Sequence, residues 1–452
     1  VMADFKKAAT ELAKTLVGKA LPPALLETWL YSRKFPEGQR PDPDGRRWDD
    51  PIVPWRFVDR IDPEFVVEAV KSLKIEQNVA KKLSRKTAKL AHHAHRQLRQ
   101  QIQGKTLEKR QVSVGLVMPG TSPRGATEKD SPFTQSSSSS IRPLKSKAIA
   151  SISDKDVIAV KSGKTILRVN GTHYRKLRVL FQRAVGRSSA SDFDFHDKLF
   201  VLLLRYEAVQ GGGFQAAADG DVFDCLLRFF DVAFECFASP LNCRYSTFCS
   251  GFYDIDKFFG SMGSFFHFSP KAGSFQANPP FVPALIAAMA VHMDALLEAT
   301  ELPLSFVVII PAWRHTTGWN KLAESAFLRH EELIAQADHG YCEGKQVLRR
   351  NRYRIASFDT SVFFLQNKAG SELWRVTEEA ITALREAFRS KQDTKPRGEG
   401  PGSSPPVSGE KRQWATHQSD AAKAHAAPKR AKKTASGGAS TQLEEEEEEE
   451  EE

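Results

Sequence analysis

The stretch Phe306-Val307-Val308-Ile309-Ile310 is the strongest structural signal in the sequence. It is wholly apolar and rich in β-branched side chains, which is typical of a strand that is buried on both faces. A second run, Ser361-Val362-Phe363-Phe364-Leu365, has nearly the same character. A strand that is covered on both faces needs helices above and below it. The two runs therefore predict a central sheet between layers of helices.

Helix-like and strand-like segments alternate around these two runs. A short buried strand is expected over residues 232–237, and helices are expected over residues 195–209, 283–299, 321–337 and 377–388. This alternation predicts an α/β fold, with a Rossmann-like doubly wound domain over residues 161–390. Ligands in such sheets bind at the carboxyl ends of the strands.

Residues 1–115 are predicted to form a separate helical, basic domain. Asp62-Pro63-Glu64 suits a helix start, because it combines a capping carboxylate with a proline in the first turn. The later part of the domain carries the cations Lys81, Lys82, Arg85, Lys86 and Lys89. They form either a solvated face or a surface that binds backbone phosphates, and the sequence leaves both interpretations open.

Two segments are expected to contribute no packed core. Residues 116–160 contain many Ser, Pro and Gly residues and are interpreted as a linker. Residues 391–452 lose periodicity and are expected to form a disordered tail that ends in poly-Glu. Two basic clusters in this tail, at residues 411–412 and 429–433, suit a two-part nuclear localisation signal. We therefore expect a nuclear protein.

Charge and cysteine content narrow the class of partner. The formal net charge is +10, and since the last nine residues are all glutamate, the rest of the chain carries +19. Such a basic body favours a polyanionic partner such as nucleic acid. The five cysteines include no Cys-x-x-Cys pair, so neither a disulfide framework nor a metal site is expected. No apolar run is long enough to cross a bilayer, so no membrane partner is expected. We also expect a monomer.

The most informative polar motif is Asn278-Pro279-Pro280-Phe281, which precedes the helix expected over residues 283–299. It resembles the catalytic motif of methyltransferases that act on an amino nitrogen in a planar system. Two prolines fix the backbone and remove two donors. The Asn278 oxygen and the Pro279 carbonyl can then accept both hydrogens of an exocyclic amino group, while Phe281 stacks on the base. An ordinary proline-rich turn is the alternative.

A second motif lies upstream, at the end of the strand expected over residues 232–237. An acid followed by a loop of small residues suits the first turn of a nucleoside-binding sheet, although the usual glycines are missing. The loop would admit the cofactor and the acid would accept from its amino or hydroxyl groups. The predicted cofactor-binding residues in this segment are Glu235, Ala238, Ser239, Pro240 and Asn242.

With these motifs, the sequence resembles the family of cap-specific adenosine methyltransferases known as phosphorylated C-terminal-domain interacting factors, or CAPAM. The order and spacing of the similar stretches agree over residues 172–370. These stretches are residues 203–206, 235–243, 259–261, 273–275 with 277–281, 310–311 with 313–314, and 364–367.

The resemblance implies a Rossmann-like methyltransferase domain paired with a helical domain. It implies S-adenosyl-L-methionine as the cofactor. It also implies methyl transfer to N6 of the 2′-O-methyladenosine that follows the 7-methylguanosine cap of mRNA.

Two features differ from the family pattern. Animal members begin with a WW domain that binds the phosphorylated tail of RNA polymerase II. Trp29, Trp48 and Trp55 lack the strand-turn context of that module, so we expect no WW domain, and recruitment to the transcription machinery stays open. His267, before Phe268, stands where the family pattern has an aspartate that contacts the cofactor adenine. Both residues are therefore assigned to the predicted cofactor site, with His267 accepting through a neutral ring nitrogen.

Four further residues are candidates for contacts with the cap and the RNA. An indole can stack on the positively charged 7-methylguanine, and an arginine can pair with the triphosphate. Core packing and surface ion pairs are the alternative roles. The candidates are Trp313, Arg314, Arg329 and His330.

We thus predict a methyltransferase that acts on the cap-adjacent adenosine of capped mRNA. One alternative is an adenine N6-methyltransferase that acts on DNA or on internal RNA sites. The other is a non-catalytic cap- or RNA-binding protein built on a methyltransferase scaffold.

Overall fold

The computed structural model describes residues 2–22, 25–26, 29–30, 61–102, 110–117, 141–144, 151–186, 191–208, 216–343 and 353–389. Three predicted features lie outside these ranges: the serine-rich part of the linker, the tail from residue 391, and with it the nuclear localisation signal. Among the described residues, no helix is long and apolar enough to cross a membrane.

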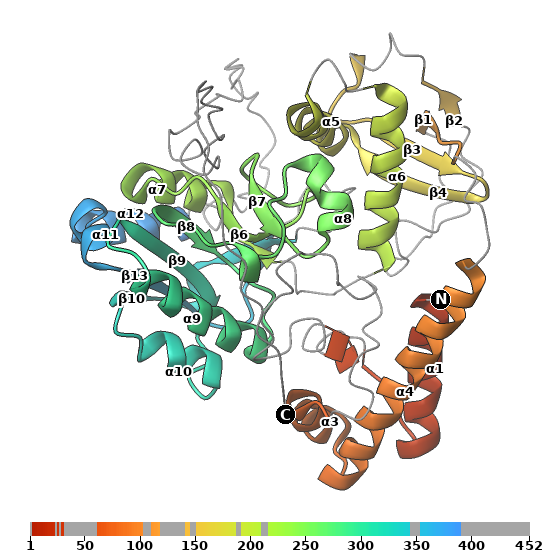
Figure 1. Ribbon diagram of the computed structural model, residues 1–452, viewed down its shortest axis with the longest axis horizontal. Coiled ribbons are helices and arrows are strands. Elements are labelled where there is room, and N and C mark those ends of the chain that lie inside the picture. The colour runs from red at the N-terminus through yellow and green to blue at the C-terminus, as the bar shows by residue number, and fades with distance from the viewer. Residues whose placement is uncertain are drawn as a thin grey trace, which may run out of the picture. The chain divides into compact units, whose positions relative to one another are not determined.

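The N-terminal part consists of helices, as the sequence predicts (Figure 1). Helices α1 (Met2–Val17) and α3 (Pro63–Leu73) both pack on α4 (Gln77–Ile102). Asp62 caps α3, since its carboxylate accepts from the Phe65 amide at 3.1 Å. Phe5, Trp29 and Phe65 are the largest side chains in a core of their own.

A four-stranded antiparallel sheet follows, in the order β2-β1-β3-β4. Its strands are β1 (Ser113–Val117), β2 (Ile141–Pro143), β3 (Val157–Ser162) and β4 (Thr165–Asn170). The predicted boundaries are wrong here, because β1, β2 and β3 run through the expected linker. Val112, Val114 and Leu116 pack on the core with a period of two, which the surrounding Ser and Pro residues concealed.

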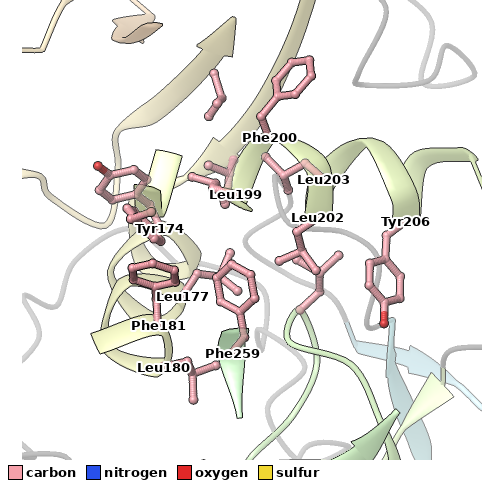
Figure 2. Packing of buried hydrophobic residues seen from close by; sticks show 14 of the residues in the cluster. Tyr174, Leu177, Leu180, Phe181, Leu199, Phe200, Leu202, Leu203, Tyr206 and Phe259 are labelled. Carbon is pink, nitrogen blue, oxygen red and sulfur yellow. The ribbon is translucent and has the colours of Figure 1, made fainter. Parts of the chain in front are cut away.

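Helices α5 (Gly171–Val185) and α6 (Asp192–Ala208) pack against this sheet. The predicted helix over residues 195–209 is thereby confirmed as α6. Figure 2 shows their shared core, in which Tyr174, Leu177 and Phe181 of α5 lie close to Leu199 and Leu203 of α6. These side chains are almost completely buried, so the layer of two helices packs against the sheet through one common core.

The central sheet has six strands in the order β10-β13-β9-β8-β6-β7. Its members are β6 (Glu235–Ala238), β7 (Phe248–Ser250), β8 (Gly273–Ala277), β9 (Leu304–Pro311), β10 (Leu328–Ile334) and β13 (Thr360–Gln366). Neighbours from β7 to β9 pair in parallel, and β13 runs antiparallel to both β9 and β10. Every residue of β9 and β13 is buried, which confirms both apolar runs as central strands.

Helices cover both faces of this sheet. Helices α7 (Gly220–Phe230) and α12 (Glu378–Arg389) pack on Val307 and Phe364, while α9 (Pro283–Glu298) and α10 (Thr317–Ala323) pack on Phe306 and Phe363. Alternate residues of one strand thus face opposite layers. The predicted Rossmann-like doubly wound α/β fold is confirmed. Shorter elements are α8 (Tyr253–Asp256), α11 (Lys368–Leu373), and the 3₁₀ turns η2 (Lys257–Phe259), η3 (Phe265–His267) and η4 (Gln336–Asp338).

The helix predicted over residues 321–337 is wrong. Helix α10 ends at Ala323, and Leu328–Ile334 forms the edge strand β10. Ala, Glu and Leu in this range favour a helix, but pairing with β13 along its whole length outweighs that local preference. A small third sheet, β12-β11-β5, joins Tyr353–Ile355, Gly340–Glu343 and Ala216–Ala217.

Candidate active site

A cleft opens where the chain reverses its direction across the central sheet. From β6 the chain passes to β7 at one edge, then returns to β8 on the other side of β6. Such a switch point, at the carboxyl ends of parallel strands, is where doubly wound sheets bind ligands. The cleft holds about 860 Å³ of empty space, part of it open solvent. Its polar lining includes Tyr206, Glu235, Ser239, Asn242, Ser250, Ser264, Gln276 and Asn278, and Phe237, Phe252, Phe265 and Phe266 supply apolar walls.

Glu235 is the acid at the floor of this cleft, and only 3% of it is exposed. Its Oε2 accepts from the backbone amides of Arg244, at 2.7 Å, and Tyr245, at 3.1 Å. Burial raises the pKa of Glu235 to about 7, against the lowering effect of these two bonds. The acid therefore closes the loop after β6 and can change its charge near neutral pH.

The loop after β6 is held by its own side chains. The Oδ1 atom of Asn242 accepts from the amide of Ser239 at 2.7 Å and from its hydroxyl at 2.9 Å. This turn brings Ala238, Ser239 and Asn242 to the cleft, together with Glu235. Pro240 is buried and does not line it.

The Asn-Pro-Pro-Phe motif follows β8 and meets the cleft with two of its four residues. Asn278 and Pro280 line the cleft, whereas Pro279 and Phe281 do not. The Pro280 carbonyl accepts from the Val282 amide at 2.7 Å, which closes a tight turn before α9. The motif thus carries the Asn278 amide from the central sheet into the cleft.

The stacking role predicted for Phe281 is not what this structure presents. Only 7% of Phe281 is exposed, and its ring makes edge contacts with Trp313, Tyr341 and Phe358 at centroid distances of 6.4, 5.7 and 5.7 Å. The ring anchors the turn in the core. A base can stack on it only if this cluster rearranges.

His267 and Phe268 also lie beside the cleft and do not line it. Phe268 stacks on Phe234, with ring centroids 4.7 Å apart and planes 5° apart. Burial and the neighbouring His292 lower the pKa of His267, so the ring is neutral at physiological pH. Its predecessors Ser264, Phe265 and Phe266 line the cleft instead. The contact between His267 and a cofactor therefore stays a prediction.

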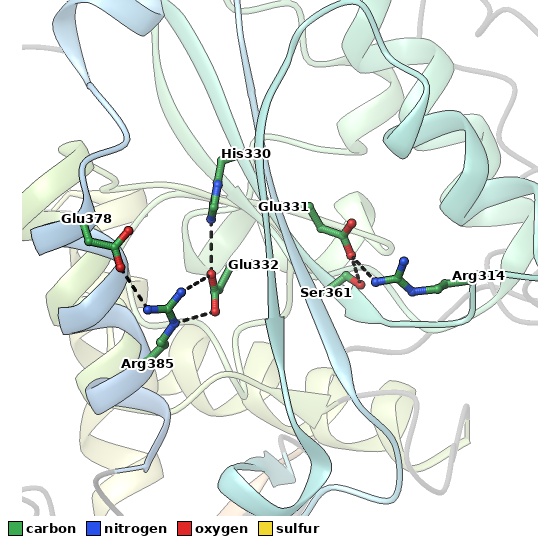
Figure 3. Close-up of polar contacts among 7 residues, drawn as sticks. All are labelled: Arg314, His330, Glu331, Glu332, Ser361, Glu378 and Arg385. Atoms are coloured by element: carbon green, nitrogen blue, oxygen red, sulfur yellow. Dashed lines mark hydrogen bonds and ion pairs between the residues drawn. The ribbon is translucent and has the colours of Figure 1, made fainter.

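The four residues predicted to hold the cap do not converge on one surface. His330 and Glu332 share one face of β10, and Glu331 lies on the other, as Figure 3 shows. On the first face, Glu332 accepts from Arg385 at 2.7 Å and from His330 Nε2 at 3.3 Å. On the second, Glu331 pairs with Arg314 at 3.3 Å and with the Ser361 hydroxyl at 2.9 Å.

The remaining two candidates differ in exposure. Trp313 is half-buried against Phe281 and Phe358. Arg329 is exposed on β10. The Arg314 guanidinium lies 4.8 Å from the ring of Trp319, which adds a cation–π contact to its ion pair. Within this group, Arg314 pairs with Glu331 and His330 bonds to Glu332. Trp313 packs partly into the core.

The basic residues of α4 present a different picture. Lys82, Arg85, Lys86 and Lys89 are exposed, and Lys81 is half-buried. Within the described ranges, none of the five pairs with a carboxylate, so this side of α4 carries uncompensated positive charge. That arrangement is compatible with both predicted interpretations, a solvated basic face and a phosphate-binding face.

Several lining residues were missed by sequence reasoning. Tyr206 comes from α6, and its hydroxyl donates to Asp256 Oδ2 at 2.7 Å. Burial raises the pKa of Asp256 to about 7. Tyr206 lies in residues 203–206, one of the stretches that carry the family resemblance. The resemblance marked this stretch but indicated no role for Tyr206. Gln276 gave no signal beyond standing two residues before Asn278.

Known proteins resemble this chain in the region that builds the cleft. A family model described as "Phosphorylated CTD interacting factor 1 WW domain" matches residues 176–344, from α5 to β11. Human and mouse proteins named "mRNA (2'-O-methyladenosine-N(6)-)-methyltransferase" are each 36% identical to this chain over 246 residues. Over half of its length, this chain is homologous to them. The match covers 52% of the chain and 35% of each relative, so the chain spans about a third of the length of these proteins.

The family match corrects one prediction. We expected no WW domain, and the description of the matching model contradicts that expectation. The expectation rested on Trp29, Trp48 and Trp55, which all precede the matched range. The matched range therefore does not include the residues on which that expectation rested.

Proposed function

We propose that this chain is an S-adenosyl-L-methionine-dependent methyltransferase that modifies N6 of the 2′-O-methyladenosine next to the 7-methylguanosine cap of mRNA. The observation that carries the proposal is the placement of Asn278 in a polar cleft at the switch point of a Rossmann-like sheet. Homology to two proteins named as mRNA (2'-O-methyladenosine-N(6)-)-methyltransferases supports the substrate class.

The residues of the cleft fit such a cofactor. Glu235 offers an acidic acceptor for an amino group, and the loop of Ala238 and Ser239 leaves room for a flat ligand. The Nε2 atom of Gln276 is buried without a partner in the described part of the chain, so it can donate to an acceptor on the cofactor. The cofactor would supply an electrophilic methyl group on a sulfonium.

The protein's own contribution is positioning. The Asn278 oxygen accepts one hydrogen of the adenine amino group, which directs the nitrogen lone pair toward the methyl donor. The Pro279 carbonyl, predicted to accept the other hydrogen, does not line the cleft in this structure. Tyr206, Phe252 and Phe266 supply aromatic walls to the cleft. No strongly basic residue is needed, because N6 becomes positively charged on methylation and then loses a proton readily.

The basic face of α4, formed by Lys81, Lys82, Arg85, Lys86 and Lys89, is proposed to bind backbone phosphates of the RNA. Trp313 remains the candidate for stacking on the cap, through the part of its ring that is exposed. The basic clusters at residues 411–412 and 429–433 support a nuclear location. The similarity to a model named for a CTD-interacting factor supports the transcription machinery as a partner.

Methyl transfer with labelled cofactor tests this proposal. Purified full-length chain is incubated with a capped RNA that begins with 2′-O-methyladenosine, with the same RNA uncapped, and with adenine-containing DNA. Nucleoside mass spectrometry is expected to find N6-methylated 2′-O-methyladenosine in the capped RNA only. Equal modification of uncapped RNA or DNA would favour the broader adenine methyltransferase. Binding of capped RNA without any modification would favour a non-catalytic cap-binding protein.

A further inference from the structure

Gln276 is the most completely buried polar side chain that lines the cleft, with 1% of its surface exposed. Its backbone amide donates to the Phe234 carbonyl at 3.0 Å, which fixes the residue in β8 beside β6. The side-chain Nε2 has no partner among the described residues. A buried amide donor without an acceptor is destabilising, because no hydrogen bond offsets the loss of its hydration. This cost is expected to be relieved when a ligand supplies the acceptor.

The neighbour of Gln276 defines which ligand group fits. Glu235 is its register partner across the parallel strands β6 and β8, so the two side chains leave the sheet on the same face, about 5 Å apart at the backbone. The cleft floor thus places a carboxyl acceptor next to an amide donor. A ligand group that matches this pair must offer a donor and an acceptor side by side.

We propose that Glu235 and Gln276 together hold the zwitterionic amino-acid end of the methyl donor, with the Gln276 amide donating to its carboxylate. This inference rests on the proposed function. An α-ammonium beside Glu235 keeps that acid ionised and offsets the charge of the ligand carboxylate, to which the Gln276 amide donates. Gln276 is then a positioning residue that fixes the methyl donor relative to Asn278, two residues further along the same chain.

Two ligands distinguish this arrangement from other uses of the amide. S-adenosylhomocysteine carries the amino-acid end, and 5′-methylthioadenosine lacks it but keeps the nucleoside. Isothermal titration of the full chain with both ligands compares wild type with Gln276→Met, which keeps the shape of the side chain and removes the donor. The variant is expected to bind S-adenosylhomocysteine about 10- to 100-fold more weakly, as loss of a bond to a charged acceptor implies. Its affinity for methylthioadenosine is expected to be unchanged.

Ser274 offers a matched control in the same strand. Its hydroxyl is also buried without a partner in the described ranges, and it shares the face of Gln276, but it does not line the cleft. Ser274→Ala is expected to bind both ligands like wild type. Thermal unfolding of all three proteins confirms that each is folded before its affinity is compared.

Each other result overturns the inference. Equal weakening of both ligands by Gln276→Met would place the amide on the nucleoside end. Unchanged affinities with a reduced turnover number would make Gln276 a partner of Asn278 or of the adenine. Failure of the wild-type chain to bind S-adenosylhomocysteine would instead refute the proposed function itself.

Discussion

The β6–β8 cleft and the β10 edge both carry the residue types of a functional site, yet their polar groups are arranged differently. In the cleft, Gln276 has a buried donor with no partner among the described residues, and one oxygen of Glu235 accepts from two backbone amides. At the β10 edge, Glu332 is bonded by Arg385 and His330, and Glu331 by Arg314 and Ser361. The polar groups at the β10 edge bond to one another, whereas the cleft keeps a buried donor that no described residue bonds. Residue type alone does not identify a ligand site. A buried polar group that lacks a hydrogen-bond partner is the more informative sign.

The largest difference between the two regions should be seen in catalysis. Asn278→Ala removes an acceptor that acts on the amino group in the transition state, so we expect turnover to fall at least ~100-fold. The affinity for S-adenosylhomocysteine and the thermal stability should change little. Arg314→Ala at the β10 edge is the matched control and should keep turnover within about twofold. Comparable losses from both substitutions would remove the distinction between the regions. Steady-state kinetics on capped RNA measures turnover, and calorimetric titration and thermal unfolding measure the affinity and the stability.

The pH dependence of ligand binding sharpens the comparison. The pKa of Glu235 is raised to about 7 by burial, so the acid becomes protonated as the pH falls below that value. If the carboxylate binds an ammonium group, affinity for S-adenosylhomocysteine should fall by up to about tenfold per pH unit below 7. Glu235→Gln should bind more weakly at pH 8 and lose this dependence. Titration calorimetry at four pH values tests it, and equal pH profiles for the two proteins would show that Glu235 only closes the loop.

The same acid should affect stability with the opposite sign. The pKa of Glu235 in the folded protein lies above its ordinary value of 4.5, so the folded state binds a proton more readily than the unfolded chain does. Its contribution to stability is therefore complete at pH below 4.5 and is lost as the pH rises to about 7. Glu235→Gln should flatten that part of the stability curve. Denaturant unfolding across this range provides the measurement.

At the β10 edge the expected effect is on folding alone. Burial raises the pKa of Glu332, but the bonds from Arg385 and His330 give a net lowering, so the acid is charged and depends on its partners. Arg385→Met should cost about 1–3 kcal/mol of stability, because it leaves that buried charge poorly paired. Arg314→Met breaks a more exposed pair and should cost under about 1 kcal/mol. Loss of turnover in folded Arg385→Met would contradict a purely structural role.

The exposed cations of α4 extend the comparison to a region whose charges are not paired. Replacing Lys82, Arg85, Lys86 and Lys89 by Gln should weaken capped and uncapped RNA similarly and flatten the salt dependence, by up to about 0.7 per phosphate contact in the log–log slope. Trp313→Ala should reduce the preference for capped RNA with little change in that slope. Binding isotherms at three salt concentrations measure both effects. An unchanged slope in the α4 variant would make that helix a solvated surface.

The fold was largely predictable because its strongest signals are periodic and apolar. The runs at 306–310 and 361–365 and the helix at 283–299 all formed as expected. The edge strand β10 was not predictable, because its burial and pairing come from β13, which lies about 30 residues away in the sequence. The strands β1 to β3 were hidden for a related reason, since each is short and joined to the next by residues without hydrophobic periodicity.

The site was predictable only where one segment carried it. The loop 238–242 and Asn278 follow strands of the sheet directly, so their arrival at one edge follows from topology. Tyr206 comes from α6, and no local pattern reports that tertiary contact. Arg314 and His330 look like ligand-binding residues in the sequence, and only the three-dimensional structure shows that they are bonded to Glu331 and Glu332.

The most direct measurement is an experimental structure of the chain with S-adenosylhomocysteine. We predict that the ligand lies in the β6–β8 cleft, with its ammonium at Glu235, its carboxylate at Gln276 and its sulfur facing Asn278. Binding at the β10 edge, or in the cleft with the amino-acid end turned away from Glu235 and Gln276, would contradict it.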